Sequence, residues 1–382
     1  MKWISEAVKN APPALIGEIL KIASEYKNVI SLSLGEPDFD TPPHVVEAGI
    51  TALRQGFTHY TSNLGILELR EAICEKLEKD NNVYITPDEV MATAGAGTAI
   101  DLLMRAVLNP GDEVLVQDPG YFNYIFIAAY IGAKIIPIHV TEENGFALNP
   151  QDLEEKITDK TKLLIVNSPA NPTGSVIPEK HLRKIADIAI EKDLLVLTDE
   201  IYEKLIYDES HFSVMSIPEM KERCVLINGF SKAYAMTGWR IGYAAGCKEI
   251  IEKMGEIQVY SGICPPGVSQ KAAVAALKGD QECIKRMWEE YSKRRPYMVN
   301  RLNQIGIPTV MPKGAFYAFP NISEYGKSEY MWKLFLEKGR VAVTPGTAFG
   351  VYGEGYLRFS YANSLENIEK ALDNIEEVIS NV

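Results

Sequence analysis

The sequence predicts an α/β protein with a large domain built on a mostly parallel sheet flanked by helices, together with a smaller α/β domain. Short apolar runs alternate with helical segments such as Ile100–Leu108 and Glu179–Lys192. The length of 382 residues and the 46% hydrophobic content suit two domains with large cores. The predicted strands end near Ala94, Gln117, Val166, Thr198 and Asn228. Sheets of this kind bind ligands at the carboxyl ends of their strands, where the polar residues of this chain gather.

The domain boundaries follow from the same pattern. The large domain is expected at 46–280, and a long charged helix over 281–301 should lead into the smaller domain. Residues 281–382 would form that domain with 1–45, which contain an N-terminal arm and an amphipathic helix over 14–25.

Composition excludes several classes of protein. A formal charge of −12 argues against a nucleic-acid partner. The longest apolar run, Tyr124–Ala133, is too short to span a membrane, and Glu6 and Glu18 interrupt any signal-peptide core. The cysteines include no C-x-x-C pair, so we expect reduced thiols, no metal site and a cytoplasmic location. They are Cys74, Cys224, Cys247, Cys264 and Cys283.

The segment 228–246 places two cations, Lys232 and Arg240, in an otherwise uncharged stretch between two apolar runs. Lys232 should lie on a turn after a strand, and Arg240 at the start of the next strand. A desolvated lysine can attack an aldehyde to form a Schiff base, and an arginine can hold a phosphate with two parallel hydrogen bonds. Pyridoxal 5′-phosphate carries both groups. The alternative is that both residues are solvated loop cations.

Ser231-Lys232, followed by Thr237-Gly-Trp-Arg240 with the arginine eight positions past the lysine, resembles the signature of the class I and II aminotransferases. These are fold type I pyridoxal-phosphate enzymes, and further motifs of the family occur in order from Ser33 to Ala362. The resemblance implies that Lys232 bonds the cofactor covalently, and that Ser231 and Arg240 contact it.

Two polar turns near the N-terminus fit the same family. The turn at Gly35-Glu-Pro-Asp-Phe39 resembles a loop whose glycine lets the backbone approach the substrate carboxylate, although a plain turn explains it equally well. Tyr60 precedes Gly65 in a turn that, in the family, reaches the cofactor phosphate of a partner subunit. The resemblance therefore implies a homodimer with shared active sites, whereas a lone tyrosine is more often a packing residue.

A glycine-rich turn leads from a predicted strand into the helix that begins near residue 99. Small residues leave backbone N–H groups open there, and the helix N-terminus adds partial positive charge. We assign Ala96, Gly97 and Thr98 to the phosphate. After the next strand, Tyr121 or Phe122 is placed to stack on a flat ring, and the resemblance favours Tyr121.

Three residues follow apolar strands where the cofactor ring would lie. Asn171, in Asn-Pro-Thr-Gly, resembles the family asparagine that contacts the phenolic oxygen and the substrate, although Asn before Pro is also a turn former. Asp199 ends a fully apolar strand and needs a positive partner, which a protonated pyridine nitrogen supplies. Tyr202 can hydrogen-bond the phenolic oxygen from the same side. A helix cap is the alternative role for Asp199.

Arg358 lies in an alternating strand of the second domain, within Gly355-Tyr-Leu-Arg-Phe-Ser-Tyr-Ala362. A surface salt bridge is its simplest explanation. The resemblance instead implies a planar fork that holds the amino-acid α-carboxylate, with domain closure on the substrate.

Together these residues predict amino transfer between an amino acid and a 2-oxo acid by a ping-pong route, with Lys232 moving the proton. A lyase that eliminates at Cβ and a binding protein without turnover are the alternatives. The segment 261–267 has no cation and Gly97 is not a lysine, so both of the family's usual side-chain carboxylate readers are missing. Tyr121, Phe122, Tyr124 and Ile263 suggest an apolar pocket for aromatic side chains or alanine, while aspartate stays open.

Overall fold

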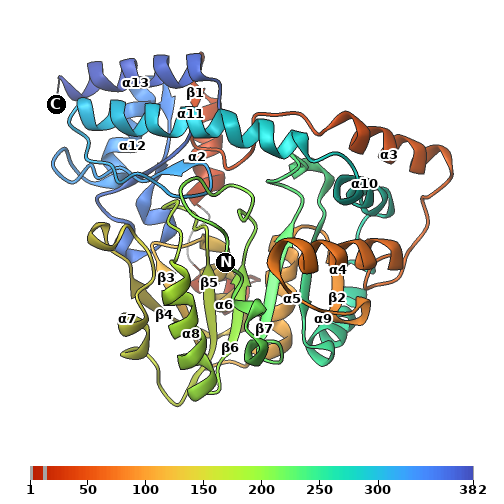
Figure 1. Ribbon diagram of the computed structural model, residues 1–382. Helices are drawn as coiled ribbons and strands as arrows, with labels where there is room; N and C mark the ends of the chain where they lie inside the picture. Colours follow the sequence, from red (N-terminus) through yellow and green to blue (C-terminus); the bar gives the residue numbers. More distant parts are fainter. Residues whose placement is uncertain (1–2, 12–14, 382) are drawn as a thin grey trace.

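A computed structural model of the protein describes residues 3–11 and 15–381. A central sheet with helices on both faces forms the larger part, and a smaller group of helices and short strands lies against one end of it (Figure 1). The predicted α/β class is confirmed. Residue 14, the first of the predicted amphipathic helix, lies outside the described residues, and the helix itself is α2 (Leu15–Ser24).

The central sheet has seven strands in the order β2-β8-β7-β6-β5-β3-β4. It is mostly parallel, as predicted, but β8 runs antiparallel to both of its neighbours. The connection over 230–241 holds no crossover helix, so β8 returns beside β7 in the opposite direction. The strands are β2 (Val90–Thr93), β3 (Glu113–Asp118), β4 (Lys134–His139), β5 (Thr161–Asn167), β6 (Leu195–Asp199), β7 (Cys224–Gly229) and β8 (Gly242–Gly246).

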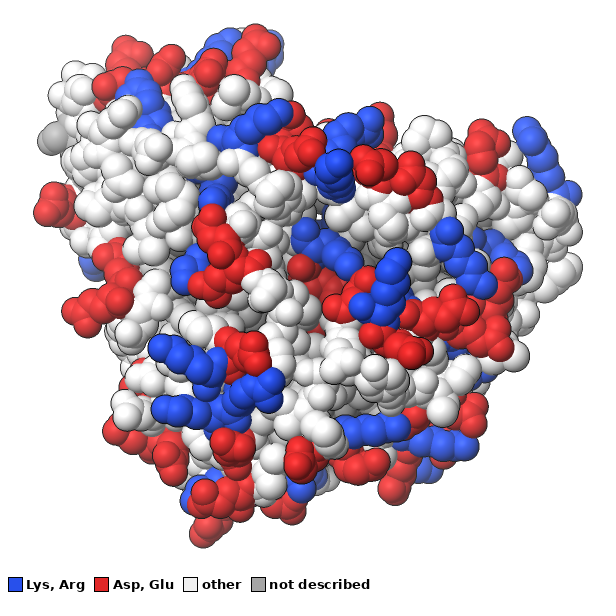
Figure 2. All heavy atoms as spheres, in the orientation of Figure 1, with Lys and Arg blue, Asp and Glu red and all other residues white. Residues whose placement is uncertain are grey.

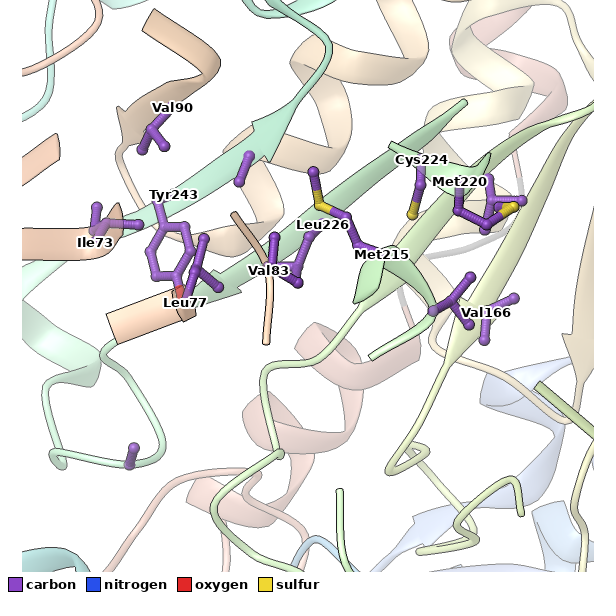
Figure 3. Close-up of a cluster of buried hydrophobic side chains, with 14 of the residues drawn as sticks. Ile73, Leu77, Val83, Val90, Val166, Met215, Met220, Cys224, Leu226 and Tyr243 are labelled. Carbon is purple, nitrogen blue, oxygen red and sulfur yellow. The ribbon is translucent and has the colours of Figure 1, made fainter. Parts of the chain in front are cut away.

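Alternation along the strands builds a separate core on each face of the sheet. In β5, Leu164 and Val166 join the apolar cluster on one face, and Leu163 and Ile165 join the cluster on the other. Figure 3 shows part of the first cluster, where Ile73 and Leu77 approach Tyr243. The first face is covered by α4 (Leu67–Asn81), α8 (Glu179–Glu191) and α10 (Gly267–Lys278), and the second by α5 (Ala96–Val107), α6 (Phe122–Ile131) and α9 (Lys248–Gly262).

The smaller group has its own core. It combines α11 (Glu282–Gln304), α12 (Ser328–Glu337) and α13 (Leu365–Ile379) with a three-stranded antiparallel sheet and residues from near the N-terminus. The sheet has the order β11-β12-β9, formed by β11 (Thr344–Pro345), β12 (Leu357–Ser360) and β9 (Tyr317–Ala318). In a separate pair, β1 (Ile30–Ser31) runs parallel to β10 (Val341–Ala342). This pairing attaches the N-terminal segment to the C-terminal part of the chain.

Three further α-helices complete the part of the chain that the structure describes. They are α1 (Glu6–Asn10), α3 (Pro43–Arg54) and α7 (Pro150–Glu154). α3 packs against α10, and the predicted boundary between residues 45 and 46 falls inside it. α11 begins two residues after the other predicted boundary, at 280. Within the described ranges, no helix combines the length and apolar character needed to cross a membrane.

Candidate active site

A cavity of about 340 Å³ opens at the carboxyl ends of the central strands and is closed from the other side by the smaller group of elements. The register places Asn167 of β5 opposite Asp199 of β6, so the polar residues that end these strands meet at one edge. Most of the predicted site residues line this cavity. They are Gly35, Ala96, Gly97, Tyr121, Asn171, Asp199, Tyr202, Ser231, Lys232, Arg240 and Arg358.

Lys232 lies on the turn after β7, as predicted, and its ammonium donates to the carbonyl oxygen of Gly35. Its Nζ is 5.8 Å from the centre of the Tyr202 ring. Burial, together with the nearby cations Arg358 and Arg240, lowers the pKa of Lys232 to about 8 against the opposing effect of two carboxylates. A lysine with this pKa is partly neutral near pH 7 to 8, the form needed for a nucleophile or a base.

Arg240 and the start of α5 together form an anion-binding corner. Arg240 has a left-handed backbone (φ 49°), which turns its side chain back so that Nη1 donates to the Thr237 carbonyl at 2.8 Å. Gly95 also has a positive φ (92°), and a Cβ there would lie 2.5 Å from Nη2 of Arg240. Because the first N–H groups of a helix have no acceptor within the helix, Ala96 and Gly97 present free donors beside this guanidinium.

Two residues predicted to contact the cofactor, Thr98 and Tyr60, do not line the cavity of this chain. The hydroxyl of Thr98 donates instead to the carbonyl of Ala94 at 3.1 Å, although its residue belongs to the first turn of α5. Tyr60 is 78% exposed and does not line the cavity. Its role was predicted for the active site of a partner subunit.

Asp199 is buried at the end of β6 and has few partners for a carboxylate. Its Oδ2 accepts a 2.6 Å hydrogen bond from the Tyr124 hydroxyl, and its Oδ1 accepts from the backbone N–H of Ile201 at 3.2 Å. Burial raises the pKa of Asp199 to about 6 despite these hydrogen bonds, and Glu200 adds to the rise. No salt bridge reaches Asp199 from the described residues. The site therefore favours a cationic group next to this carboxylate.

Tyr202 lies opposite Tyr317, and their hydroxyls are 2.7 Å apart. Both side chains are buried, and burial is the largest cause that raises the pKa of each phenol. Tyr317 also lies close to Gly35. A Cβ on Gly35 would lie 2.3 Å from the Tyr317 oxygen, so only glycine fits at this position. The absent side chain of Gly35 therefore allows close approach here.

Arg358 is buried in β12, only 3% exposed, so the surface salt bridge considered for it does not apply. Its Nη1 donates to Oδ1 of Asn171 at 2.9 Å, and its Nη2 donates to the carbonyl of Ser33 at 2.5 Å. The guanidinium lies 4.5 Å from the centre of the Tyr317 ring. Its Nε is buried without a partner among the described residues. A buried cation with no carboxylate partner is suited to an anionic ligand.

Tyr121 and Phe122 both line the cavity, at the start of α6. Their rings meet edge to face, with centroids 4.7 Å apart. Tyr121 also contacts the Tyr124 ring, at 5.4 Å and 86°. Both aromatic rings are therefore available to stack on a flat ring bound in the cavity.

Several lining residues were missed by the sequence interpretation. Asn167 follows an apolar strand just as Asp199 does, and this signal was available in the sequence. Tyr317 lies in a two-residue strand far from any motif, and only the fold places it here. The others are Ser33, Leu34, Glu36, Ile100, Ile201 and Thr237.

Comparisons with known proteins agree with this geometry. The family model for aminotransferase class I and II matches residues 27–375. The chain is 46% identical to an aspartate aminotransferase of Pyrococcus abyssi and 42% identical to aromatic-amino-acid aminotransferase 2 of Thermococcus litoralis, with 98% of each chain covered in both cases. It superposes on an aromatic aminotransferase from Pyrococcus horikoshii with a TM-score of 0.91 and 45% identity, over 96% of this chain and 99% of that one. The chain therefore belongs to the class I and II aminotransferases, a family of pyridoxal-phosphate-dependent enzymes, and it is an aminotransferase.

Proposed function

We propose that the cavity binds pyridoxal 5′-phosphate and that the enzyme moves an amino group between an L-amino acid and a 2-oxo acid by a ping-pong route. The observation that carries this proposal is one cavity that holds a lysine of lowered pKa, a buried carboxylate and a buried arginine. Among the described residues, the carboxylate makes no salt bridge to a cation and the arginine makes none to a carboxylate. Each of these groups lacks the partner that the cofactor or the substrate would supply.

The residues present fit the cofactor at each of its polar positions. Arg240, Ser231 and the N–H groups of Ala96 and Gly97 would hold the phosphate, with Thr98 in the same helical turn. Asp199 would pair with the pyridine nitrogen. Because Gly95 has no side chain, the space next to the Arg240 guanidinium is open, which supports close approach of an anion there.

Three more residues would position the ring. Asn171 and Tyr202 would hydrogen-bond the phenolic oxygen, and Tyr121 would stack on the ring. In the structure the Tyr202 hydroxyl is bonded to Tyr317, so it would have to share or exchange that partner. Asn171 already bonds Arg358, which would link the cofactor contact to the substrate contact.

Bound pyridoxal 5′-phosphate supplies an aldehyde that exchanges with amino groups and a protonated ring that accepts electrons released at the substrate Cα. Lys232 would take the proton from the substrate Cα as a general base and deliver it to C4′ of the cofactor as a general acid. Arg358 would hold the α-carboxylate with Asn171 and so orient the Cα–H bond toward Lys232. The carbonyl oxygen of Gly35 accepts a hydrogen bond from the Lys232 ammonium. This bond would hold the side chain in position while it carries the proton.

The substrate class is inferred from the lining. In the described part of the chain, the cavity is lined by three cations, Lys232, Arg240 and Arg358, and all three have roles above. Of the four residues expected to form an apolar pocket, Tyr121 and Phe122 line the cavity, and Ile100 lines it as well. The other two do not: Tyr124 is buried with its hydroxyl on Asp199, and Ile263 is 41% exposed. From the lining that remains we expect aromatic amino acids or alanine as donors. Among the relatives, one is named for aspartate and another for aromatic amino acids, so aspartate is retained as a candidate.

We also propose a cytoplasmic homodimer with shared active sites. Its support is the exposed Tyr60, whose family counterpart reaches a partner's cofactor, together with exposed apolar residues such as Tyr260 and Ile263. The cores on the two faces of the central sheet support a large domain at 46–280, and the separate core of the smaller group supports a small domain formed by 1–45 and 281–382, which would close on the substrate.

A lyase acting at Cβ would use the same lysine, and a binding protein would not turn over at all. Incubation with single amino acids separates the three functions. An aminotransferase converts the cofactor absorbance to that of pyridoxamine phosphate and is restored by a 2-oxo acid. Release of pyruvate from serine or cysteine without that conversion would favour the lyase, and an unchanged spectrum would favour the binding protein.

A further inference from the structure

A second cavity, of about 610 Å³, lies away from the active site, between α4, α10, α11 and the loop after β6. Figure 2 shows a hollow between α11 and α4, with both basic and acidic side chains around it. Five lysines line this cavity, against the two acids Glu75 and Asp80, in a protein whose net charge is −12. The lysines are Lys76, Lys79, Lys204, Lys278 and Lys285.

The lysines differ in how well they are paired. Lys204 is 2.7 Å from Asp80, and Lys285 is 3.8 Å from Glu282. Lys79 and Lys278 make no salt bridge to any residue that the structure describes. The other three lysines are paired with carboxylates, and Glu75 lines the cleft without a salt bridge to a described residue. The unpaired groups therefore carry a small net positive charge, and the ammonium groups of Lys79 and Lys278 are available to an anionic ligand.

Lys76, which lines the cleft, is held by buried polar groups of the protein. Lys76 pairs with the buried carboxylate of Glu203 and donates to Oδ1 of Asn81 at 2.6 Å. Asn81 donates in turn to Glu203 at 2.7 Å and to Glu200 at 3.1 Å. Lys76 is therefore fixed, with its side chain only 10% exposed. Apolar side chains, Leu277, Ile284 and Trp288 among them, form the rest of the wall.

We propose that this cleft is a binding site for a small organic anion that carries two or more negative charges. Lys79 and Lys278 would pair with its charged groups, and the wall that contains Trp288 would cover its carbon framework. Carboxylates and phosphates share this chemistry. The proposal does not depend on the identity of the amino-acid substrate or on the roles given to the active-site residues.

Calorimetric titration of the holoenzyme with citrate, pyrophosphate and adenosine monophosphate tests the proposal and separates the two anion types. We expect saturable binding of citrate or adenosine monophosphate, with one site per chain, and weaker binding of pyrophosphate, which carries charge but no carbon framework. The double variant K79A/K278A should weaken that binding at least about tenfold, because it removes two charge-assisted contacts. The matched control K180A/K184A removes the same charge from exposed lysines of α8 and should bind as the wild type does.

The active site also attracts anions, so the variant R358A is titrated in parallel. Binding that survives in R358A and is lost in K79A/K278A assigns the anion to the cleft. The proposal is overturned if neither citrate nor adenosine monophosphate binds saturably, if K79A/K278A binds like the wild type, or if K180A/K184A weakens binding as much as K79A/K278A does. Loss of binding in R358A alone would place the anion in the active site and would overturn it as well.

Discussion

The hydroxyl of Tyr124 donates a 2.6 Å hydrogen bond to Oδ2 of Asp199, and both side chains are buried. Asp199 lines the cavity, whereas Tyr124 does not. The hydrogen bond stabilises the ionised form of Asp199, whose pKa burial raises to about 6. Tyr124 is thus a positioning residue that acts through Asp199.

Tyr124→Phe should move the acidic limb of the pH profile to higher pH. Loss of a hydrogen bond to a charged group costs about 1.5 to 3 kcal/mol, which corresponds to a rise of about one to two units in the pKa of Asp199. The pH dependence of kcat/KM measures this shift. Tyr130→Phe, in a half-exposed residue of the same helix, is the control and should leave the profile unchanged. An unshifted limb in the Tyr124 variant would show that the hydrogen bond does not tune Asp199.

Asp199→Asn should slow turnover by several orders of magnitude, because a neutral amide cannot keep the ring nitrogen protonated. The same change should stabilise the protein without cofactor. The folded pKa of Asp199, about 6, is above the unfolded value of about 3.9, so the wild type loses stability as the pH rises from about 4 to 6. The variant does not titrate there and avoids that loss.

Denaturant unfolding of the two cofactor-free proteins at pH 8 and pH 4 measures the difference. We expect the variant to be more stable at pH 8 by on the order of 2 kcal/mol, and the advantage to disappear at pH 4. A wild type that is more stable at pH 8 would mean that Asp199 has a cation partner within the protein.

Arg358→Ala should lower kcat/KM by about a hundredfold to a thousandfold for every amino acid, since two charge-assisted hydrogen bonds to the α-carboxylate are lost. Arg358→Lys keeps the charge but not the planar fork, and should recover only part of the activity. Steady-state kinetics with alanine, tyrosine and aspartate test whether the loss is uniform. A loss confined to aspartate would show that Arg358 reads the side-chain carboxylate.

Aromatic amino acids or alanine, with 2-oxoglutarate as acceptor, should be used at least as well as aspartate. The reason is the lining, which includes Tyr121, Phe122 and Ile100 and, among the described residues, no cation besides Lys232, Arg240 and Arg358. A substrate panel that compares kcat/KM values decides this. A preference for aspartate of about a hundredfold, or about 2.7 kcal/mol, would require a carboxylate reader from elsewhere, such as a partner subunit.

The parts of the fold that could be predicted are those with a local pattern. The fully apolar runs before Asn167 and Asp199 predicted strands of a parallel sheet, and the turns after them placed the polar residues at one edge. Lys232 and Arg240 were found because cations are rare in the segment between β7 and β8. The helix predicted over Glu179–Lys192 is present as α8 (Glu179–Glu191).

The contacts that could not be predicted depend on tertiary structure. Tyr317 meets Tyr202 across 115 positions of sequence, and Ser33 meets Arg358 across 325. Neither Tyr317 nor Ser33 has a local signal that distinguishes it from an ordinary core residue. The bond from Tyr124 to Asp199 is of the same kind, because a tyrosine within an apolar helix is usually a packing residue.

The central claim is that Lys232 bonds the cofactor and moves the proton, and one measurement tests it most directly. The enzyme is loaded with pyridoxal 5′-phosphate, reduced with borohydride and digested, and the modified peptide is identified by mass spectrometry. Wild type and the exposed-lysine control Lys184→Ala should carry the cofactor on Lys232, with full turnover before reduction. Lys232→Ala should carry none and should not turn over. Cofactor fixed to another lysine in the wild type, or turnover retained by Lys232→Ala, would contradict the claim.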